Sequence, residues 1–242
     1  MPHIQEEPKF SAPAEVHPFA GVLSDLDGTI IDSTDAIVKH WHKLGKQLGV
    51  DPNVILATSH GRRSIDVLKL YDPSLATWEH VCHVEGLIPK EFGRDAVEIP
   101  GARTFLDRLE EVGARWAIVT SGTRPLATGW LDVMKLAHPK NLVCAEMVEN
   151  GKPDPACYLL GHSMLGVAPG EPVLVFEDAP AGVQAGKAAG FKVVALATTH
   201  TVDQLKEAGA DWIVRDMRSV TLKAYDNESG RISIEISDAL QE

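Results

Sequence analysis

The sequence DLDGTI, residues 25–30, follows an apolar run over residues 19–23 that is typical of a buried strand. Two carboxylates therefore stand at the C-terminal end of a strand, which is where open α/β sheets bind ligands. Side chains alternate along a strand, so Asp25 and Asp27 face the same side and repel each other unless a cation or a proton lies between them. Gly28 permits a sharp turn directly after them. The stretch indicates a ligand site, or else an ordinary Asp-Gly turn at a strand end.

The composition around this stretch is that of an ordinary globular protein. The chain has 242 residues, of which 44% are apolar, and its formal net charge is −11. A negative charge of this size disfavours nucleic acid and anionic membrane surfaces as partners. Three cysteines without a paired motif are typical of a reducing cytosol, and no apolar run approaches the roughly 20 residues of a membrane helix. We therefore expect a cytoplasmic protein that binds neither nucleic acid nor membrane.

Strand and helix patterns alternate along most of the chain and predict an α/β fold with a parallel, doubly wound sheet. Strands are expected at residues 19–24, 116–119, 142–144, 173–176, 192–196 and 212–214. Helices are expected at residues 102–112, 126–134, 155–165, 179–189 and 202–208. A small hairpin is expected at residues 222–225 and 232–236, around a Ser-Gly turn.

The remaining segments predict how the chain divides into domains. Residues 1–18 are rich in proline and lack periodicity, which predicts a flexible tail. Residues 34–98 begin with an amphipathic helix and continue as short helices that end at prolines, the last at Pro89. We interpret them as a small helical insert. The α/β core then comprises residues 19–33 and 99–242.

Two further strand ends carry groups that could hold a phosphate. Residues 119–123, VTSGT, offer the hydroxyl of Ser121 and the amide of Gly122, which could bind a phosphate oxygen or simply cap a helix. Residues 151–155, GKPDP, hold Lys152 between two prolines that restrict the backbone. A rigidly held ammonium is a suitable counter-charge for phosphate and carboxylates, and the alternative is a surface lysine.

The fourth strand end is acidic. Residues 173–178, VLVFED, end in Glu177 and Asp178. Asp178 could complete a Mg²⁺ site with Asp25, because magnesium prefers few carboxylates together with waters and phosphate. Glu177 could orient a bound water or Lys152. The alternative is that both acids are solvated.

These four segments, in this order and each at a predicted strand end, resemble the four motifs of the haloacid dehalogenase superfamily, whose members are mostly Mg²⁺-dependent phosphohydrolases. The resemblance covers residues 19–215. It implies a Rossmann-like core with a helical cap of the C1 type inserted after the first strand. It also implies that Asp25 is the nucleophile, that Asp27 is the general acid and base, and that Mg²⁺ is held by Asp25, Asp178 and the Asp27 carbonyl.

The same resemblance assigns the phosphate to Ser121, Gly122 and Lys152 and gives Glu177 a supporting role. The segments HGRR, TSGTR, FEDAPAG and ATTH narrow the likeness to the fungal glycerol-3-phosphate phosphatases and 2-deoxyglucose-6-phosphate phosphatases. Ile37 matches the position at which mutases of the superfamily carry a histidine, which argues against mutase chemistry.

The polar, glycine-containing segment TSHGRR predicts how the helical insert contacts a substrate. Its residues His60, Arg62 and Arg63 could donate hydrogen bonds to a small polyhydroxylated phosphate. The alternative is a solvated loop with two surface arginines.

We therefore expect a monomeric enzyme that hydrolyses a small polyol or sugar phosphate, glycerol phosphate or a hexose 6-phosphate, with Mg²⁺ and through an aspartyl-phosphate. One alternative is a phospho-acceptor signalling module, which also uses an acidic pocket on a doubly wound sheet. A cap beside the site argues against that module. The other alternative is a phosphomutase or dehalogenase of the same superfamily.

Overall fold

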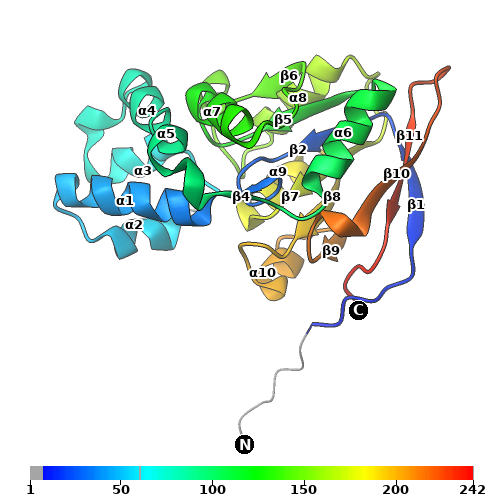
Figure 1. Cartoon of the computed structure of the whole chain (residues 1–242), viewed down its shortest axis with the longest axis horizontal. Helices are drawn as coiled ribbons and strands as arrows, with labels where there is room; N and C mark the ends of the chain where they lie inside the picture. Colours follow the sequence, from blue (N-terminus) through cyan, green and yellow to red (C-terminus); the bar gives the residue numbers. More distant parts are fainter. Residues whose placement is uncertain (1–7, 60, 242) are drawn as a thin grey trace, which may run out of the picture.

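A six-stranded parallel sheet forms the centre of the molecule (Figure 1). The structure, a computed structural model, describes residues 8–59 and 61–241. The strand order is β6-β5-β2-β7-β8-β9, with every neighbouring pair parallel. The strands are β2 (Gly21–Ser24), β5 (Trp116–Val119), β6 (Asn141–Val143), β7 (Val173–Glu177), β8 (Lys192–Leu196) and β9 (Trp212–Val214). This order confirms the predicted doubly wound α/β fold.

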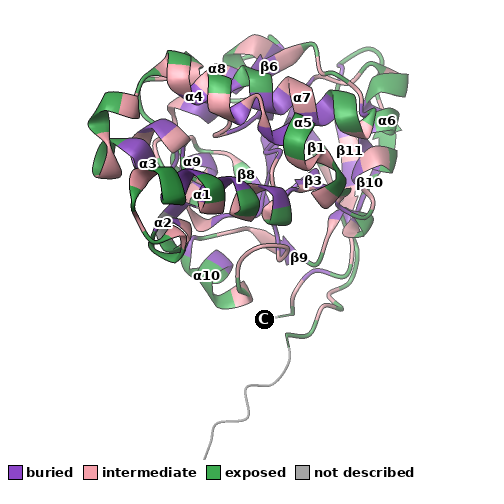
Figure 2. Cartoon of the chain, turned by 60° about the vertical axis from the view of Figure 1, so that its left-hand side comes forward, coloured by how far each residue is buried: buried purple, intermediate pink, exposed green. Residues whose placement is uncertain are grey.

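Helices cover both faces of the sheet, which is why its strands read as continuous apolar runs (Figure 2). The helices and short 3₁₀ turns of the core are α6 (Ala102–Val112), α7 (Arg124–Met134), η3 (Ala145–Met147), α8 (Ala156–Leu165), α9 (Pro180–Ala188), α10 (Val202–Glu207) and η4 (Met217–Ser219). Leu174 and Phe176 of β7 join one hydrophobic cluster with α6 and α7, while Val173 and Val175 join the other with α8, α9 and α10. The strands and helices of this core lie within two residues of their predicted bounds.

A second group of helices lies to one side of the sheet (Figure 1). It comprises α1 (Thr34–Leu48), α2 (Pro52–Ser59), α3 (Ser64–Tyr71), η1 (Pro73–Leu75), α4 (Trp78–Glu85), α5 (Ile88–Phe92) and η2 (Gly93–Asp95). These helices share a hydrophobic cluster of their own, which includes Trp41, Leu68 and Val81. The chain enters and leaves this helical group through two short antiparallel strands, β3 (Ile31–Asp32) and β4 (Val97–Glu98). Their pairing fixes the two connections side by side.

A separate antiparallel sheet has the order β1-β11-β10. Strands β10 (Val220–Tyr225) and β11 (Ile232–Ile236) form the predicted hairpin. Strand β1 (Glu15–Phe19) pairs with the other edge of β11. The inward side chains Ile232, Ile234 and Ile236 are buried in the same cluster as α6.

Two predictions are wrong in this part of the chain. Residues 15–18 of the predicted flexible tail belong to β1, because β11 offers them an open strand edge. Pro18 is compatible with that position at the edge of a sheet. Residues 1–7 lie outside the described part of the chain. Pro89, predicted to end a helix, instead stands in the first turn of α5, where a missing N–H costs little.

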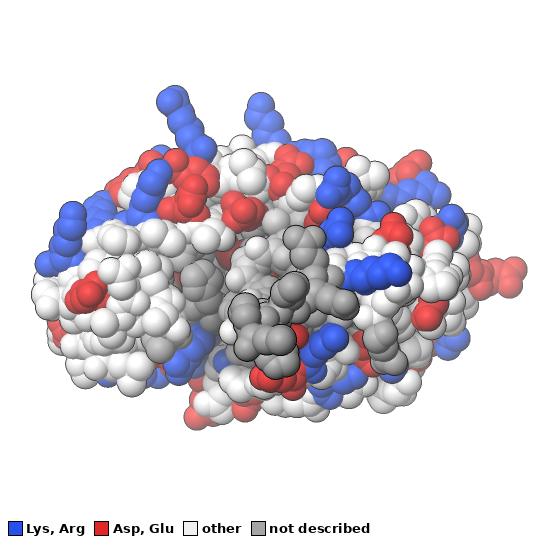
Figure 3. Space-filling model, turned by 90° about the horizontal axis from the view of Figure 1, so that it is seen from below, with Lys and Arg blue, Asp and Glu red and all other residues white. Residues whose placement is uncertain are grey.

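Charges of both signs are interspersed over the face shown in Figure 3. Within residues 8–59 and 61–241, no helix combines the length and the apolar character needed to span a membrane.

Candidate active site

A pocket enclosing about 100 Å³ lies where the C-terminal strand ends of the parallel sheet meet the helical group. The sheet side contributes, among others, Asp25, Asp27, Gly28, Thr120, Ser121, Gly122, Lys152, Glu177, Asp178 and Thr199. The helical side contributes, among others, Thr34, Ile37, His40, Trp41, Ser59, Gly61, Arg62, Ser64, Glu85 and Ile88. Four sequence segments that were separate predictions thus line one cavity, as expected for parallel strands whose carboxyl ends share an edge.

Lys152 is the buried cation of the sheet side. Its Nζ lies 2.5 Å from Oδ1 of Asp25 and 2.6 Å from Oε1 of Glu177, and it donates to the Val119 carbonyl at 3.1 Å. Burial alone would lower the pKa of Lys152, but the charges of Asp25 and Glu177 hold it above its ordinary value. The ammonium therefore stays charged and offsets two carboxylates.

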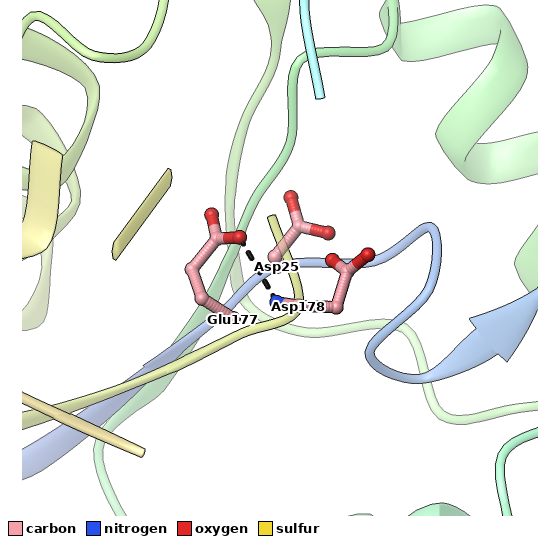
Figure 4. Close-up of side chains that lie close together, drawn as sticks. All are labelled: Asp25, Glu177 and Asp178. Atoms are coloured by element: carbon pink, nitrogen blue, oxygen red, sulfur yellow. Dashed lines mark hydrogen bonds between the residues drawn. The ribbon is translucent and has the colours of Figure 1, made fainter. Parts of the chain in front are cut away.

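Glu177 is fully engaged by protein groups. Besides the ammonium, Oε1 accepts a hydrogen bond from the Tyr158 hydroxyl at 2.6 Å, and Oε2 accepts from the amides of Asp178 and Ala179 at 3.1 and 3.3 Å. Figure 4 shows its contact with the Asp178 amide. A Cβ at Gly182 would lie 1.8 Å from Oε1, so the first turn of α9 must be glycine here. Because both of its carboxylate oxygens are bound by protein groups, Glu177 can hold Lys152 and the Asp178 backbone in position.

Asp25, Glu177 and Asp178 place carboxylate oxygens within 4.8 Å of one another (Figure 4). Burial, with the charge of Glu177, raises the pKa of Asp178 to about 7, and burial is also the main cause that raises the pKa of Asp25. Thr29 donates to Oδ1 of Asp178 at 3.2 Å and Thr199 donates to Oδ2, which fixes that carboxylate. Crowded, buried, oxygen-only ligands suit a hard divalent cation such as Mg²⁺ and not zinc.

Asp27 has a different environment from Asp25. Ser33 donates a hydrogen bond to its Oδ1 at 2.5 Å, and burial raises its pKa. Ser33 stands at the N-cap position of α1, but its side chain makes no capping bond. A held carboxyl group with a raised pKa can both give and accept a proton.

Ser121 and Gly122 reach the pocket, but their polar groups are paired inside the protein. The Ser121 hydroxyl donates to the Gly61 carbonyl of the helical group at 2.9 Å. The Gly122 amide donates to the Thr120 hydroxyl at 2.9 Å. A bound phosphate would have to replace these partners.

The two predicted cap arginines have different surroundings. Arg62 is exposed and lines the pocket. Arg63 is buried, and its guanidinium donates to Asp66 at 2.7 Å and to the carbonyls of Val148 and Glu149 at 2.9 and 3.0 Å. The bonds to Val148 and Glu149 join the helical group to the core, so this geometry gives no support to the prediction that Arg63 contacts the substrate.

The third predicted cap residue, His60, lies outside the described residues. A contact that sequence reasoning missed is made nearby by Glu85, at the end of α4. Its buried carboxylate accepts from the Ser64 hydroxyl at 2.5 Å and from the Thr123 amide of the core at 2.7 Å. Burial raises its pKa. No local pattern signals this role, because the partner lies 38 residues away along the chain.

The family described as haloacid dehalogenase-like hydrolase matches residues 22–196. Glycerol-1-phosphate phosphohydrolase 1 of Saccharomyces cerevisiae is 40% identical over 226 residues, which cover 90% of this chain and 90% of that protein. 2-deoxyglucose-6-phosphate phosphatase 1 of the same yeast is 36% identical over 236 residues, covering 90% of this chain and 95% of that one. A solved hydrolase from Pseudomonas syringae superposes with a TM-score of 0.69 at 25% identity, over 82% of this chain and 94% of that one. The family resemblance carried by the four motifs is confirmed.

Proposed function

We propose that this chain, which belongs to the haloacid dehalogenase-like hydrolase family, hydrolyses phosphate monoesters of small polyols or sugars. The observation that carries the proposal is the buried pair of Asp25 and Lys152, 2.5 Å apart, with Asp27 two residues further on in the same pocket. The pocket volume of about 100 Å³ also suits a small ligand, well below the roughly 300–1,000 Å³ of pockets for drug-sized molecules. The two yeast relatives, named for glycerol phosphate and a hexose 6-phosphate, support this substrate class.

In this mechanism, a carboxylate oxygen of Asp25 attacks phosphorus in line with the leaving alkoxide, and an aspartyl-phosphate forms as the ester P–O bond breaks. Asp27 gives its proton to the alkoxide and then takes one from the water that attacks the intermediate. That water releases inorganic phosphate and restores the Asp25 carboxylate. Ser33 holds Asp27 in place for both transfers.

The phosphate would be held by Lys152, Ser121 and the Gly122 amide, which stabilise its equatorial oxygens. Mg²⁺ bound by Asp25, Asp178 and the Asp27 carbonyl would offset the negative charge that the carboxylates share with the phosphate. Glu177 keeps Lys152 and the Asp178 backbone in position. Arg62 is the cap cation best placed to meet the substrate.

We also propose that residues 34–98 act as a cap domain on a core of residues 19–33 and 99–242. The separate hydrophobic cluster of the helices supports this division. A cap that closes over the bound ester would select its alcohol portion and limit the access of bulk water while the phosphoryl group passes to Asp25. We expect the enzyme to act as a cytoplasmic monomer.

The test is release of inorganic phosphate from glycerol phosphate, a hexose 6-phosphate and para-nitrophenyl phosphate, each with Mg²⁺ or with excess chelator. We expect continuous turnover that prefers the first two substrates, stops in chelator and returns with Mg²⁺. A phospho-acceptor signalling module would be labelled once and would not turn over. Full activity in chelator would contradict the metal assignment alone.

A further inference from the structure

Glu85, at the end of α4, brings a buried carboxylate of the helical group to the wall of the pocket. Its Oε2 accepts from the amide of Thr123, the residue directly after Gly122, whose own amide is assigned to the phosphate. Its Oε1 accepts from the hydroxyl of Ser64, which also lines the pocket. Both oxygens are therefore held by protein groups, and the carboxylate is fixed beside the position proposed for the phosphate.

Glu85 also occupies the start of α7. The amide of the N-cap residue Thr123 binds Glu85, and the next amide, that of Arg124, donates to Oε1 of Glu146 at 3.1 Å. Amides at the start of a helix attract anions, because they lack partners within the helix and stand at its positive end. Here the protein's own carboxylates take both amides, so a second anionic group of a substrate would have to displace one of them.

The charges around the pocket are also unfavourable to a second anionic group. Lys152 is paired with two carboxylates, and Arg62 is exposed, so solvent screens its charge. Bound Mg²⁺ and the two negative charges of a phosphate monoester would roughly cancel each other. The excess of acids would therefore remain once the ester is bound. The charged residues among the described lining are Asp25, Asp27, Glu85, Glu177 and Asp178, against Arg62 and Lys152.

Of the five acids, Glu85 is the one that the helical group contributes. Burial is the main cause that raises its pKa, and the charge of Asp27 acts in the same direction, so the two carboxylates repel each other. Charges inside a buried site are screened much less than charges on the surface. The charge of Glu85 therefore acts on whatever occupies the space between the helical group and the phosphate.

We propose that the charge of Glu85 excludes phosphate esters whose alcohol portion is itself negatively charged, so that the enzyme selects uncharged polyol or sugar phosphates. The inference rests on the proposed phosphatase function and narrows its substrate class. Selection of this kind comes from repulsion of the wrong substrate and requires no contact with the right one. It is therefore compatible with a carboxylate whose two oxygens are already bound by protein groups.

The experiment compares glycerol 3-phosphate with 3-phosphoglycerate, which has a carboxylate in place of the terminal CH₂OH group. The carboxamide of 3-phosphoglycerate, which has nearly the shape of the acid but no carboxylate charge, separates charge from shape. We expect the wild type to prefer glycerol 3-phosphate to 3-phosphoglycerate by about 100-fold or more in kcat/KM, and to accept the carboxamide at least about 10-fold better than the acid. This comparison does not depend on any variant. A carboxamide rejected as strongly as the acid would overturn the proposal.

Glu85→Gln assigns the selection to Glu85. Its amide oxygen can accept from Thr123 while its NH₂ group donates to the Ser64 hydroxyl, so both contacts can persist without the charge. We expect the ratio of kcat/KM for glycerol 3-phosphate to that for 3-phosphoglycerate to fall about 10-fold or more. Glu146→Gln, the same change at the start of α7 but outside the described pocket lining, should alter this ratio by less than about 3-fold and is the matched control.

The ratio also separates selection from a structural role, because a looser attachment of the helices would lower both kcat/KM values alike. Thermal unfolding confirms that the Glu85→Gln protein is folded. An unchanged ratio in the folded variant, or an equal change in Glu146→Gln, would overturn the assignment to Glu85. If the wild type releases phosphate from neither glycerol 3-phosphate nor para-nitrophenyl phosphate, the proposed function fails instead.

Discussion

On the sheet side of the pocket, the buried charges of Asp25, Lys152 and Asp178 face one another inside the cavity. On the helical side, the buried charges of Arg63 and Glu85 bind backbone groups of the core. Both sides bury charge at a cost. The sheet side gathers three charged groups around the pocket, whereas Arg63 and Glu85 are bound to backbone groups of the core, although Glu85 also lines the pocket. We infer that the sheet side supplies the chemistry, while the buried charges of the helical side hold the helices in place. Removing a charge from the sheet side should therefore lower the catalytic rate. Removing one from the helical side should lower the free energy of unfolding.

The largest effect should follow Asp25→Asn. An amide is a poor nucleophile, so we expect kcat to fall by at least about 10³-fold. The fold should persist, because Lys152 keeps its 2.6 Å contact with Glu177 and is not left as an unpaired buried charge. Initial rates and thermal unfolding measure the two effects, with the exposed Asp107→Asn as control. A folded variant that keeps more than about 1% of the wild-type rate would exclude Asp25 as the nucleophile.

Asp178→Asn tests whether the crowded carboxylates form a Mg²⁺ site. Burial and Glu177 raise the pKa of Asp178 to about 7, so its charge costs free energy in the metal-free protein. We expect the variant to unfold no earlier than the wild type in chelator, yet to lose the rise in unfolding temperature that Mg²⁺ gives the wild type. Its kcat/KM should fall about 10²-fold at low Mg²⁺. An unchanged Mg²⁺ response would remove Asp178 from the metal site.

The adjacent arginines test the helical side. Arg63→Ala leaves the Val148 and Glu149 carbonyls without their donors, and we expect a loss of about 3 kcal/mol in the free energy of unfolding. Arg63→Lys should lose nearly as much, since one ammonium cannot reproduce the planar fork. Arg62→Ala should leave stability within about 0.5 kcal/mol and raise KM.

Urea unfolding and kinetics on glycerol phosphate and para-nitrophenyl phosphate measure these effects. The loss of activity in Arg63→Ala should be similar for both substrates, because it acts through the placement of the helices. A selective loss on glycerol phosphate with unchanged stability would return Arg63 to the substrate-contacting role that the sequence suggested.

The same comparison explains what could be predicted from sequence. Asp25, Lys152 and Asp178 stand at the ends of apolar strands, and a parallel sheet brings such ends to one edge. That geometry follows from local patterns and the chain order alone. The strand β1 was missed because its partner β11 lies more than 200 residues away, and because Pro13 precedes β1 and Pro18 lies within it.

The helical side could not be predicted in the same way. Arg63 and Glu85 carry charges typical of a solvated surface, and only the packing of helices on the core gives them buried partners. Ser33 likewise satisfied a local rule for helix caps while its hydroxyl binds Asp27. A pattern within one element does not contain the contacts that form between the helical group and the core.

The smallest effect concerns His40, the buried polar residue of the helical side that has no core partner at Nε2. Its pKa is lowered from 6.5 to about 4 by burial and then by Lys43 and His80, with Glu91 acting in the opposite direction. As the pH falls below about 6.5, the unfolded chain binds a proton that the folded chain binds only near pH 4. The free energy of unfolding therefore falls progressively as the pH drops from about 6.5 to about 4. Between pH 7 and pH 5, the wild type should lose about 2 kcal/mol relative to His40→Phe, and His42→Phe should follow the wild type. Urea unfolding of the three proteins across this range measures the difference, and parallel curves for wild type and His40→Phe would show that His40 is not held neutral by burial in the pocket wall.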